Sequence, residues 1–224
     1  MTNLPAGRGD PSLLMRLSSA PIRVLIADDH EILREGVVSV LSAAAGVEVV
    51  GQADTGEMAL ALFERLRPDV TILDLKMPGM GGLRALKDML CINRKARILA
   101  LTTYHGDVLA REVMEAGAAG YLIKRAMRKE LLEAVTNLAN GHKYISLDVA
   151  MELGQHIDSE PLSARELEVL RLVSVGKTNR EIAAQMGVSE ETIKSHVKTI
   201  LCKTRARDRT HAVAIALRRG MLMV

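Results

Sequence analysis

Short apolar runs alternate with longer amphipathic segments five times between residues 22 and 141. Runs of four to six mostly apolar residues are typical of strands buried on both faces of a parallel sheet, and the longer segments repeat apolar residues at helical spacing. The predicted strands are residues 23–27, 47–52, 69–73, 97–101 and 120–123. The predicted helices are residues 31–42, 56–66, 82–91, 107–116 and 127–139. This alternation predicts an α/β domain at 22–141, built on a doubly wound five-stranded parallel sheet.

The pattern changes after residue 141. Residues 142–160 are less regular and are interpreted as a linker. From residue 161 the apolar positions follow helical spacing alone, which predicts a small all-α domain at 161–224 with helices at 164–175, 179–186, 190–203 and 209–219. The expected N-caps of these four helices are Ser163, Thr178, Ser189 and Asp208. Residues 1–21 lack a long apolar stretch, so we interpret them as a flexible tail and not as a signal peptide.

Charge is distributed unevenly between the two predicted domains. Residues 161–224 contain twelve Lys and Arg against six Asp and Glu, a formal charge of +6, whereas residues 1–160 contain eighteen against twenty-one, a charge of −3. Such asymmetry favours an acidic sensing or catalytic half and a basic half that faces nucleic acid. Two cysteines provide no disulfide framework, and no apolar stretch has the length of a membrane span. We therefore expect a cytoplasmic protein without a membrane partner.

Polar side chains directly follow four of the predicted strands. They are Asp28 and Asp29, Asp74, Thr102 and Lys124. The carboxyl ends of the strands form the ligand crevice of an open α/β sheet, so these groups are expected to converge. Taken singly, an Asp after a strand is usually a turn or cap residue. Their coincidence at four strand ends instead favours a site for a hard divalent cation and a phosphoryl group.

This set of groups suits aspartyl phosphate chemistry. Asp74 would act as a nucleophile toward phosphorus. Lys124 would pair with a phosphoryl oxygen, and Thr102 would donate a hydroxyl hydrogen bond to it. Mg²⁺ prefers oxygen ligands, and clustered carboxylates repel one another without a cation. The predicted metal ligands are Asp28, Asp29, Asp74 and a backbone carbonyl near Lys76.

Four sequence stretches carry a family resemblance in this half: ADDH at 27–30, DLKMPGMGG at 74–82, LTTY at 101–104 and GAAGYLIK at 117–124. With them, residues 22–141 resemble the flavodoxin-like receiver domain of two-component response regulators. The resemblance implies that Asp74 takes a phosphoryl group from a partner sensor histidine kinase, with Mg²⁺ bound by Asp28, Asp29, Asp74 and the carbonyl of Lys76. It also implies that Thr102 and Tyr121 form a switch pair, in which the hydroxyl moves toward the phosphate and the aromatic ring turns inward.

The basic half contains a helix-turn-helix pattern. A helical segment at 178–183 is followed by a turn that contains Gly187 and then by the helix at 190–203. One face of this last helix would pack on the domain through Ile193, Val197, Ile200, Leu201 and Thr204. The residues that face outward are Thr192, Lys194, Ser195 and Lys198. A helix with such a face is suited to the major groove of DNA, although a basic helix alone is a weak signal.

Residues 162–223 resemble the LuxR-type DNA-binding domain of the NarL/FixJ class of regulators. The matching stretches are LSARELEVL at 162–170, GKTNREIA at 176–183, VSEETIKSHV at 188–197 and DRTHA at 208–212. The resemblance implies that Lys194, Ser195 and Lys198 lie in the major groove and that the phosphate backbone is contacted by Thr178, Asn179 and Thr192. It also implies that the last helix contributes to a homodimer. Thr204 and Arg205 depart from the family, which has an apolar core residue and a turn glycine at these positions.

The two halves together predict a transcription factor in which phosphorylation of Asp74 controls sequence-specific binding to double-stranded DNA, with RNA polymerase as a candidate partner. The only enzymatic activity expected is self-directed phosphoryl transfer and autodephosphorylation. A phosphatase of the haloacid-dehalogenase type needs an Asp two residues after the nucleophile, where this chain has Lys76. A dinucleotide-binding domain needs a glycine-rich turn after the first strand, where this chain has Asp-Asp-His at 28–30. A phosphorylation-independent DNA-binding regulator remains the alternative.

Overall fold

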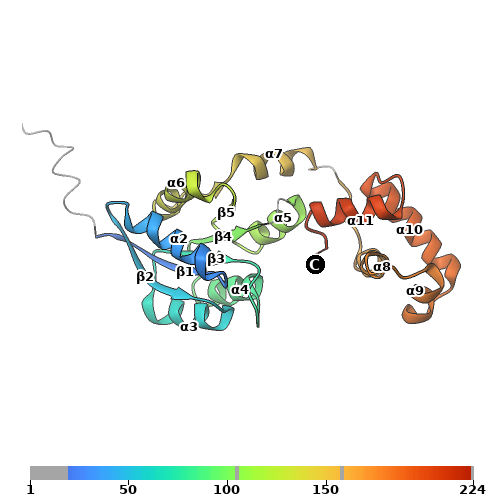
Figure 1. Cartoon of the computed structure of the whole chain (residues 1–224), viewed down its shortest axis with the longest axis horizontal. Coiled ribbons are helices and arrows are strands. Elements are labelled where there is room, and N and C mark those ends of the chain that lie inside the picture. Colours follow the sequence, from blue (N-terminus) through green and yellow to red (C-terminus); the bar gives the residue numbers. More distant parts are fainter. Residues whose placement is uncertain (1–19, 104–105, 157–158, 223–224) are drawn as a thin grey trace, which may run out of the picture.

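The computed structural model describes residues 20–103, 106–156 and 159–222. The flexible tail predicted at 1–21 lies outside these residues, except for Ala20 and Pro21. A sheet with its helices forms one part of the molecule, and a cluster of four helices forms the other (Figure 1). Within the described ranges, no helix is both long and apolar enough to cross a membrane.

The sheet is parallel throughout and contains six strands: β1 (Ile22–Ala27), β2 (Val47–Ala53), β3 (Val70–Asp74), β4 (Ile98–Thr102), β5 (Gly120–Ile123) and β6 (Tyr144–Ile145). Their order is β2-β1-β3-β4-β5-β6. The doubly wound parallel sheet is confirmed, but the predicted count of five strands was wrong. The sixth strand is two residues long, which is too short to produce a recognisable pattern, and it pairs Tyr144 with Gly120 of β5.

Helices cover both faces of the sheet. Along β1, Val24 and Ile26 point to one face, where they pack against α2 (Glu31–Ser42) and α6 (Met127–Ala139). Leu25 and Ala27 point to the other face. The helices of that face are α3 (Gly56–Leu66), α4 (Gly82–Ile92) and α5 (Asp107–Glu115). This alternation explains why the strands β3, β4 and β5 are buried along their whole length, whereas the edge strand β2 is only partly buried.

The segment predicted to be an irregular linker contains regular structure. After β6 the chain forms helix α7 (Leu147–Gln155), which packs against α5 and buries Val149 in the core beneath the sheet. The opposite side of α7 leaves Leu147 and Met151 exposed. This helix is nine residues long and carries Gly154 near its end, and the sequence analysis did not predict it.

The C-terminal helices are α8 (Ala164–Ser174), α9 (Asn179–Met186), α10 (Glu190–Thr204) and α11 (Arg209–Arg218). Each begins directly after its predicted N-cap, and all four caps accept a hydrogen bond from a backbone N–H. Ser163 and Thr178 form complete capping boxes with Glu166 and Glu181. A separate apolar core, centred on Val169, Ile193 and Ile200, holds the four helices together.

Thr204 and Arg205, the two departures from the family pattern, are both accommodated at the end of α10. Thr204 is 6% exposed, and its hydroxyl donates to the Ile200 carbonyl at 2.7 Å, so the buried polar atom is satisfied. Arg205 adopts the left-handed conformation that the family glycine would provide, with φ of 54°. A residue with a Cβ in this conformation costs about 1 kcal/mol. The chain therefore makes the same turn into α11 without a glycine.

Candidate functional site

Three carboxylates gather where β1 and β3 end. Asp28 and Asp74 are buried, with exposed fractions of 0% and 1%, whereas Asp29 and His30 lie at the exposed rim. Each of these four residues offers a ligand atom, and the four atoms all lie within 4.8 Å of one another. The convergence that parallel strands predicted for the three aspartates is therefore present in the structure.

The backbone around the carboxylates is held by specific hydrogen bonds. The His30 N–H donates to Asp28 Oδ1 at 2.9 Å, and the Lys76 N–H donates to Asp74 Oδ1 at 3.0 Å. Arg34 on α2 donates from Nη1 to the Asp28 carbonyl at 2.6 Å. Sequence patterns could not single out Arg34, because its contact is with a backbone atom and depends on how α2 packs beside β1.

Lys124 joins the two buried carboxylates. Its Nζ lies 2.7 Å from Asp28 Oδ2 and 2.7 Å from Asp74 Oδ2. Its backbone N–H donates to the Thr102 carbonyl at 2.7 Å, which places the end of β5 beside the end of β4. Burial alone lowers the pKa of Lys124, but its hydrogen bonds with Asp28 and Asp74 outweigh that effect and raise the pKa above the ordinary lysine value. Lys124 is therefore a firmly protonated ammonium.

Burial dominates the electrostatics of Asp74. Desolvation raises the pKa of its carboxyl group, and the hydrogen bonds from Lys124 and from the Lys76 N–H oppose the rise without cancelling it. The site thus contains three clustered carboxylates, and the Lys124 ammonium contacts the two buried ones, Asp28 and Asp74. This excess of negative charge on oxygen atoms fits a hard divalent cation such as Mg²⁺, which takes carboxylate ligands.

Thr102 and Tyr121 lie on neighbouring strands beside this site. Both are buried, with exposed fractions of 1% for Thr102 and 0% for Tyr121. Burial raises the pKa of the Tyr121 hydroxyl, and a side-chain hydrogen bond with Thr102 opposes the rise. The two residues that were predicted to form a switch pair are therefore in contact, and the tyrosine ring is turned inward.

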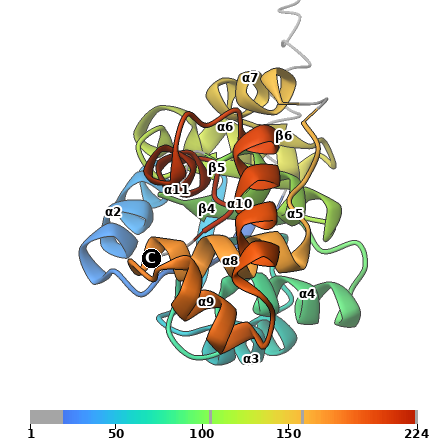
Figure 2. The ribbon, with the colours of Figure 1, turned by 90° about the vertical axis from the view of Figure 1, so that its right-hand side faces the viewer.

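A second candidate site lies on α10. Its buried face consists of Ile193, Ile200 and Thr204, and Val197 and Leu201 are partly buried against the same core. The four predicted outward-facing residues are all exposed: Thr192, Lys194, Ser195 and Lys198. Seen from the side of the C-terminal helices, α10 lies in front of the sheet (Figure 2). Helices α9 and α10 occupy the end of the molecule opposite to α2 and α3 (Figure 1).

The predicted phosphate contacts lie at helix N-termini. Thr178 accepts a hydrogen bond from the Glu181 N–H, and its hydroxyl donates to Glu181 Oε2 at 2.7 Å. Asn179 is the first residue of α9 and is half-buried. Thr192 lies in the first turn of α10, with its hydroxyl 2.8 Å from that of Ser189. Helix N-termini carry a partial positive charge, which suits contact with phosphate groups.

Two family models match this chain. The model of the response regulator receiver domain matches residues 24–136, and that of the luxR family of bacterial regulatory proteins matches residues 160–216. The chain belongs to the NarL/FixJ class of response regulators. Members of this class are transcription factors and not classical enzymes, and this response regulator accordingly combines a receiver domain with a LuxR-type DNA-binding domain.

Similar proteins span nearly the whole response regulator. YxjL of Bacillus subtilis, an uncharacterized transcriptional regulatory protein, is 37% identical, and the alignment covers 90% of this chain and 97% of YxjL. The transcriptional regulatory protein LiaR of B. subtilis is 35% identical, with 90% and 99% covered. RcsB from Salmonella enterica serovar Typhimurium, solved bound to a promoter with the phosphomimetic BeF3−, gives a TM-score of 0.70 at 27% identity, covering 88% of this chain and 98% of RcsB.

Proposed function

We propose that this response regulator accepts a phosphoryl group on Asp74 from a sensor histidine kinase and thereby controls its binding to specific double-stranded DNA. The observation that carries the proposal is the buried Asp74 carboxylate, which lies 2.7 Å from the Lys124 ammonium and beside two further carboxylates. A carboxylate held in this way can attack phosphorus, while the adjacent ammonium neutralises a phosphoryl oxygen.

Each residue at the strand ends has a distinct role in the proposed reaction. An oxygen of Asp74 forms the new bond to phosphorus as the bond to the kinase histidine breaks. Lys124 and the Thr102 hydroxyl then hold two of the phosphoryl oxygens. The Mg²⁺ ligands would be Asp28, Asp29, Asp74 and the backbone carbonyl of Lys76, and the bound ion would supply charge neutralisation. Hydrolysis by water releases inorganic phosphate and returns Asp74 to the free carboxylate, so the chemistry is confined to the protein's own side chain.

The Thr102–Tyr121 pair supplies the proposed switch. A Thr102 hydroxyl that turns toward a phosphoryl oxygen exchanges its hydrogen bond with Tyr121 for a charge-assisted one, which is stronger. The Tyr121 ring is already turned inward beside Thr102, as the proposed switch requires. A charge change at Asp74 is thereby converted into a packing change near α5.

The output of the switch is the C-terminal domain. We assign residues 22–141 to the receiver, 142–160 to the linker and 161–224 to DNA binding, and we place the protein in the cytoplasm. Lys194, Ser195 and Lys198 would reach base edges, and Thr178, Asn179 and Thr192 would contact phosphates. The promoter-bound structure of RcsB, which has a similar fold, supports DNA binding by this chain. A homodimer on a two-fold operator and contact with RNA polymerase complete the proposal.

The proposal is tested by incubating the protein with acetyl phosphate and measuring intact mass, with Mg²⁺ and then with EDTA. With Mg²⁺ we expect a mass gain of one phosphoryl group, and with EDTA we expect none. The reason is that the clustered carboxylates need a bound cation before a further anionic group can be added to the site. In a second measurement, the phosphorylated and unphosphorylated proteins are each used to select genomic DNA fragments. Phosphorylation without any change in DNA affinity would favour the alternative, a phosphorylation-independent regulator.

Lys194→Ala is expected to weaken binding to the selected DNA by roughly 1–3 kcal/mol if Lys194 reaches a base edge. The Lys194 side chain is exposed on α10, where its Nζ lies 3.4 Å from Glu191 Oε2 and 3.9 Å from Glu190 Oε1. Exposed ion pairs of this kind are weak, so Lys194 can leave them to contact DNA. Binding is measured over a series of salt concentrations. Arg165→Ala, on the exposed side of α8, is the matched control and should leave the affinity unchanged. Equal affinities for Lys194→Ala and the unsubstituted protein would contradict the groove position.

A further inference from the structure

A hollow lined by basic residues lies at the amino edge of the sheet, where β4, β5 and β6 begin. Its volume is about 350 Å³, within the range of roughly 300–1,000 Å³ that is usual for small-ligand sites. Its basic residues are Arg94, Lys95, Arg97, His142 and Lys143, and no acidic residue is among the described residues that line it. We call this place the basic hollow. Its Lys and Arg residues carry a formal charge of +4, which exceeds the +3 of the whole chain.

Neighbouring carboxylates do not neutralise these cations. Arg94, Lys95 and Lys143 are exposed, and their side chains form no ion pair with the residues that the structure describes. Arg97 is half-buried, and its Nη1 donates to the Ala139 carbonyl at 2.6 Å, which fastens the guanidinium to the end of α6. A guanidinium has five N–H donors, so others remain for a ligand. Like charges held close together repel one another, and an anion in the basic hollow would relieve that repulsion.

The two loops that carry the cations are held in place by their own hydrogen bonds. Before β4, the Lys95 N–H donates to Asn93 Oδ1 at 3.0 Å. Before β6, Gly141 has a φ of 82°, a conformation that favours glycine, and the His142 N–H donates to the Asn137 carbonyl at 2.9 Å. A site whose backbone is already ordered loses less conformational entropy when a ligand binds.

The helix dipoles do not account for this concentration of charge. Helices α4, α5 and α6 all end at this edge, and a helix C-terminus attracts cations, but the attraction falls off beyond the last turn. None of the three helices has a basic residue in its last turn. Of the four cations, Arg97 reaches a C-terminal carbonyl, and the others lie in the loops beyond the helices. Most of the charge therefore remains available to a ligand.

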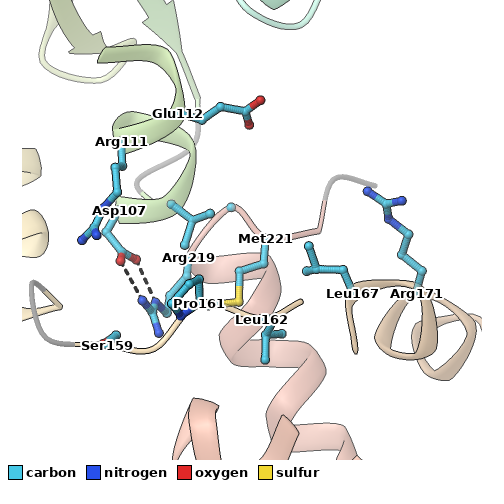
Figure 3. Close-up of a pocket in the computed structure, with 12 residues that line it drawn as sticks. Asp107, Arg111, Glu112, Ser159, Pro161, Leu162, Leu167, Arg171, Arg219 and Met221 are labelled. Carbon is cyan, nitrogen blue, oxygen red and sulfur yellow. Dashed lines mark hydrogen bonds and ion pairs between the residues drawn. The ribbon is translucent and has the colours of Figure 1, made fainter. Parts of the chain in front are cut away.

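The cavity between the receiver and the C-terminal helices differs in this respect (Figure 3). It holds about 230 Å³, and three arginines line it together with Asp107 and Glu112. Asp107 accepts two hydrogen bonds from Arg219, from Nε to Oδ1 at 2.8 Å and from Nη2 to Oδ2 at 2.7 Å (Figure 3). Both residues are buried, so Arg219 is neutralised where it lies. An anion is therefore attracted more strongly to the basic hollow than to this cavity.

The basic hollow is separate from both sites described above. Parallel strands place it at the opposite edge of the sheet from Asp74, and the five residues of β3 span about 16 Å. A small ligand there does not contact Asp74. Figure 1 shows the chain entering β1 at the end of the molecule away from α9 and α10. A duplex bound along α10 would lie at the other end, so the basic hollow does not extend the DNA-binding surface.

We propose that the basic hollow binds a small ligand that carries two or more phosphate groups, such as a nucleoside diphosphate or triphosphate. Arg94 and Arg97 supply guanidinium groups, which bind phosphate oxygens in a two-pronged geometry. Lys95 and Lys143 supply compact positive charges. A single phosphate group carries about two negative charges at neutral pH, so four cations are matched better by a ligand with several phosphate groups. This binding site goes beyond phosphoryl transfer to Asp74 and does not require it.

The test is isothermal titration calorimetry of the full chain with inorganic tripolyphosphate in EDTA at low salt. EDTA removes Mg²⁺, so the clustered carboxylates at the other edge repel the ligand and do not bind it. We expect saturable binding of one tripolyphosphate per chain that weakens as salt is added. Inorganic phosphate should bind at least about tenfold more weakly, because it makes fewer charge-assisted hydrogen bonds. ATP is titrated next, and whichever of ATP and tripolyphosphate binds more tightly assigns the site to nucleotides or to inorganic polyphosphate.

Arg94→Gln combined with Lys143→Gln removes two cations from the basic hollow and should weaken tripolyphosphate binding at least about tenfold. Arg128→Gln combined with Lys129→Gln is the matched control. It removes the same two residue types from exposed positions in the first turn of α6, at the other edge of the sheet, and should leave the affinity unchanged. The basic C-terminal helices are the same in both variants, so any attraction to them is common to both. Thermal unfolding without ligand checks that both variants are folded.

A loss of affinity in the variant of the basic hollow alone would support the proposal. Equal weakening in both variants would show a diffuse attraction to net charge, and unchanged affinity in both would place the ligand elsewhere; either result would overturn the proposal. The absence of saturable binding by the unsubstituted protein would overturn it as well. Inorganic phosphate that binds as tightly as tripolyphosphate would overturn the need for several phosphate groups. All these measurements are made without phosphoryl uptake, so they leave the proposed function to be judged separately.

Discussion

Asp74→Asn is expected to abolish phosphoryl uptake from acetyl phosphate. The substitution keeps the size and shape of the side chain but replaces the anionic nucleophile with an amide, which does not attack phosphorus under these conditions. Because Asp74 is 1% exposed and its pKa is raised by burial, removing its charge relieves desolvation. Lys124 keeps its contact with Asp28 at 2.7 Å. The variant should therefore fold normally, and the loss of phosphoryl uptake should result from the missing nucleophile and not from unfolding.

The measurement is intact mass after incubation with acetyl phosphate and Mg²⁺, alongside a thermal unfolding curve. Asp88→Asn is the matched control, since Asp88 is a half-buried aspartate on α4 that pairs only with Arg84 among the contacts of the described residues. It should accept one phosphoryl group at the unsubstituted rate. If Asp74→Asn gained the same mass as the control, the acceptor would have to be another residue and the assignment of the site would be wrong.

Gly82→Ala is expected to destabilise the fold by about 3 kcal/mol and to slow phosphoryl uptake. A Cβ at this position would lie 1.9 Å from the Asp74 carbonyl oxygen and 2.6 Å from the Leu75 Cα. Both atoms belong to the backbone, so no flexible side chain can move aside, and overpacking of this kind costs about 1–3 kcal/mol or more. Relief of the clash would require the end of β3 to shift, and Asp74 would shift with it.

The free energy of unfolding is measured by urea denaturation, and the uptake rate by the acetyl phosphate assay. Gly36→Ala provides the matched control, because Gly36 is also in a helix and no atom lies within 4 Å of the place that a Cβ would take there. This substitution should stabilise the protein by about 0.5–1 kcal/mol, since alanine has the higher helix propensity. Similar stabilities for the two variants would show that α4 does not approach β3 as closely as described.

Physical rules made the helices, the strands and the acidic site predictable from the sequence. A parallel sheet covered on both faces requires continuous apolar strands, so the pattern located five of the six strands. Parallel strands end at one edge, so polar residues after separate strands had to meet. Helical periodicity separated the buried Ile193 and Ile200 from the exposed Lys194 and Lys198 in the same way.

Contacts between surfaces that are far apart along the chain could not be predicted, because they produce no periodic pattern in the sequence. Strand β6 is too short for a pattern, and α7 became visible only through its packing against α5. Arg34 supports the acidic site by donating a hydrogen bond to the Asp28 backbone carbonyl, and the residue types in the sequence do not indicate such a backbone contact. The pairing of Asp107 with Arg219 depends on how two separately cored domains dock. The sequence by itself determined most of the helices and strands, the acidic edge of the sheet and the exposed face of α10. Only the tertiary structure decided how the last helix is held against the receiver, because the docking of two domains depends on the shape and charge of their whole surfaces.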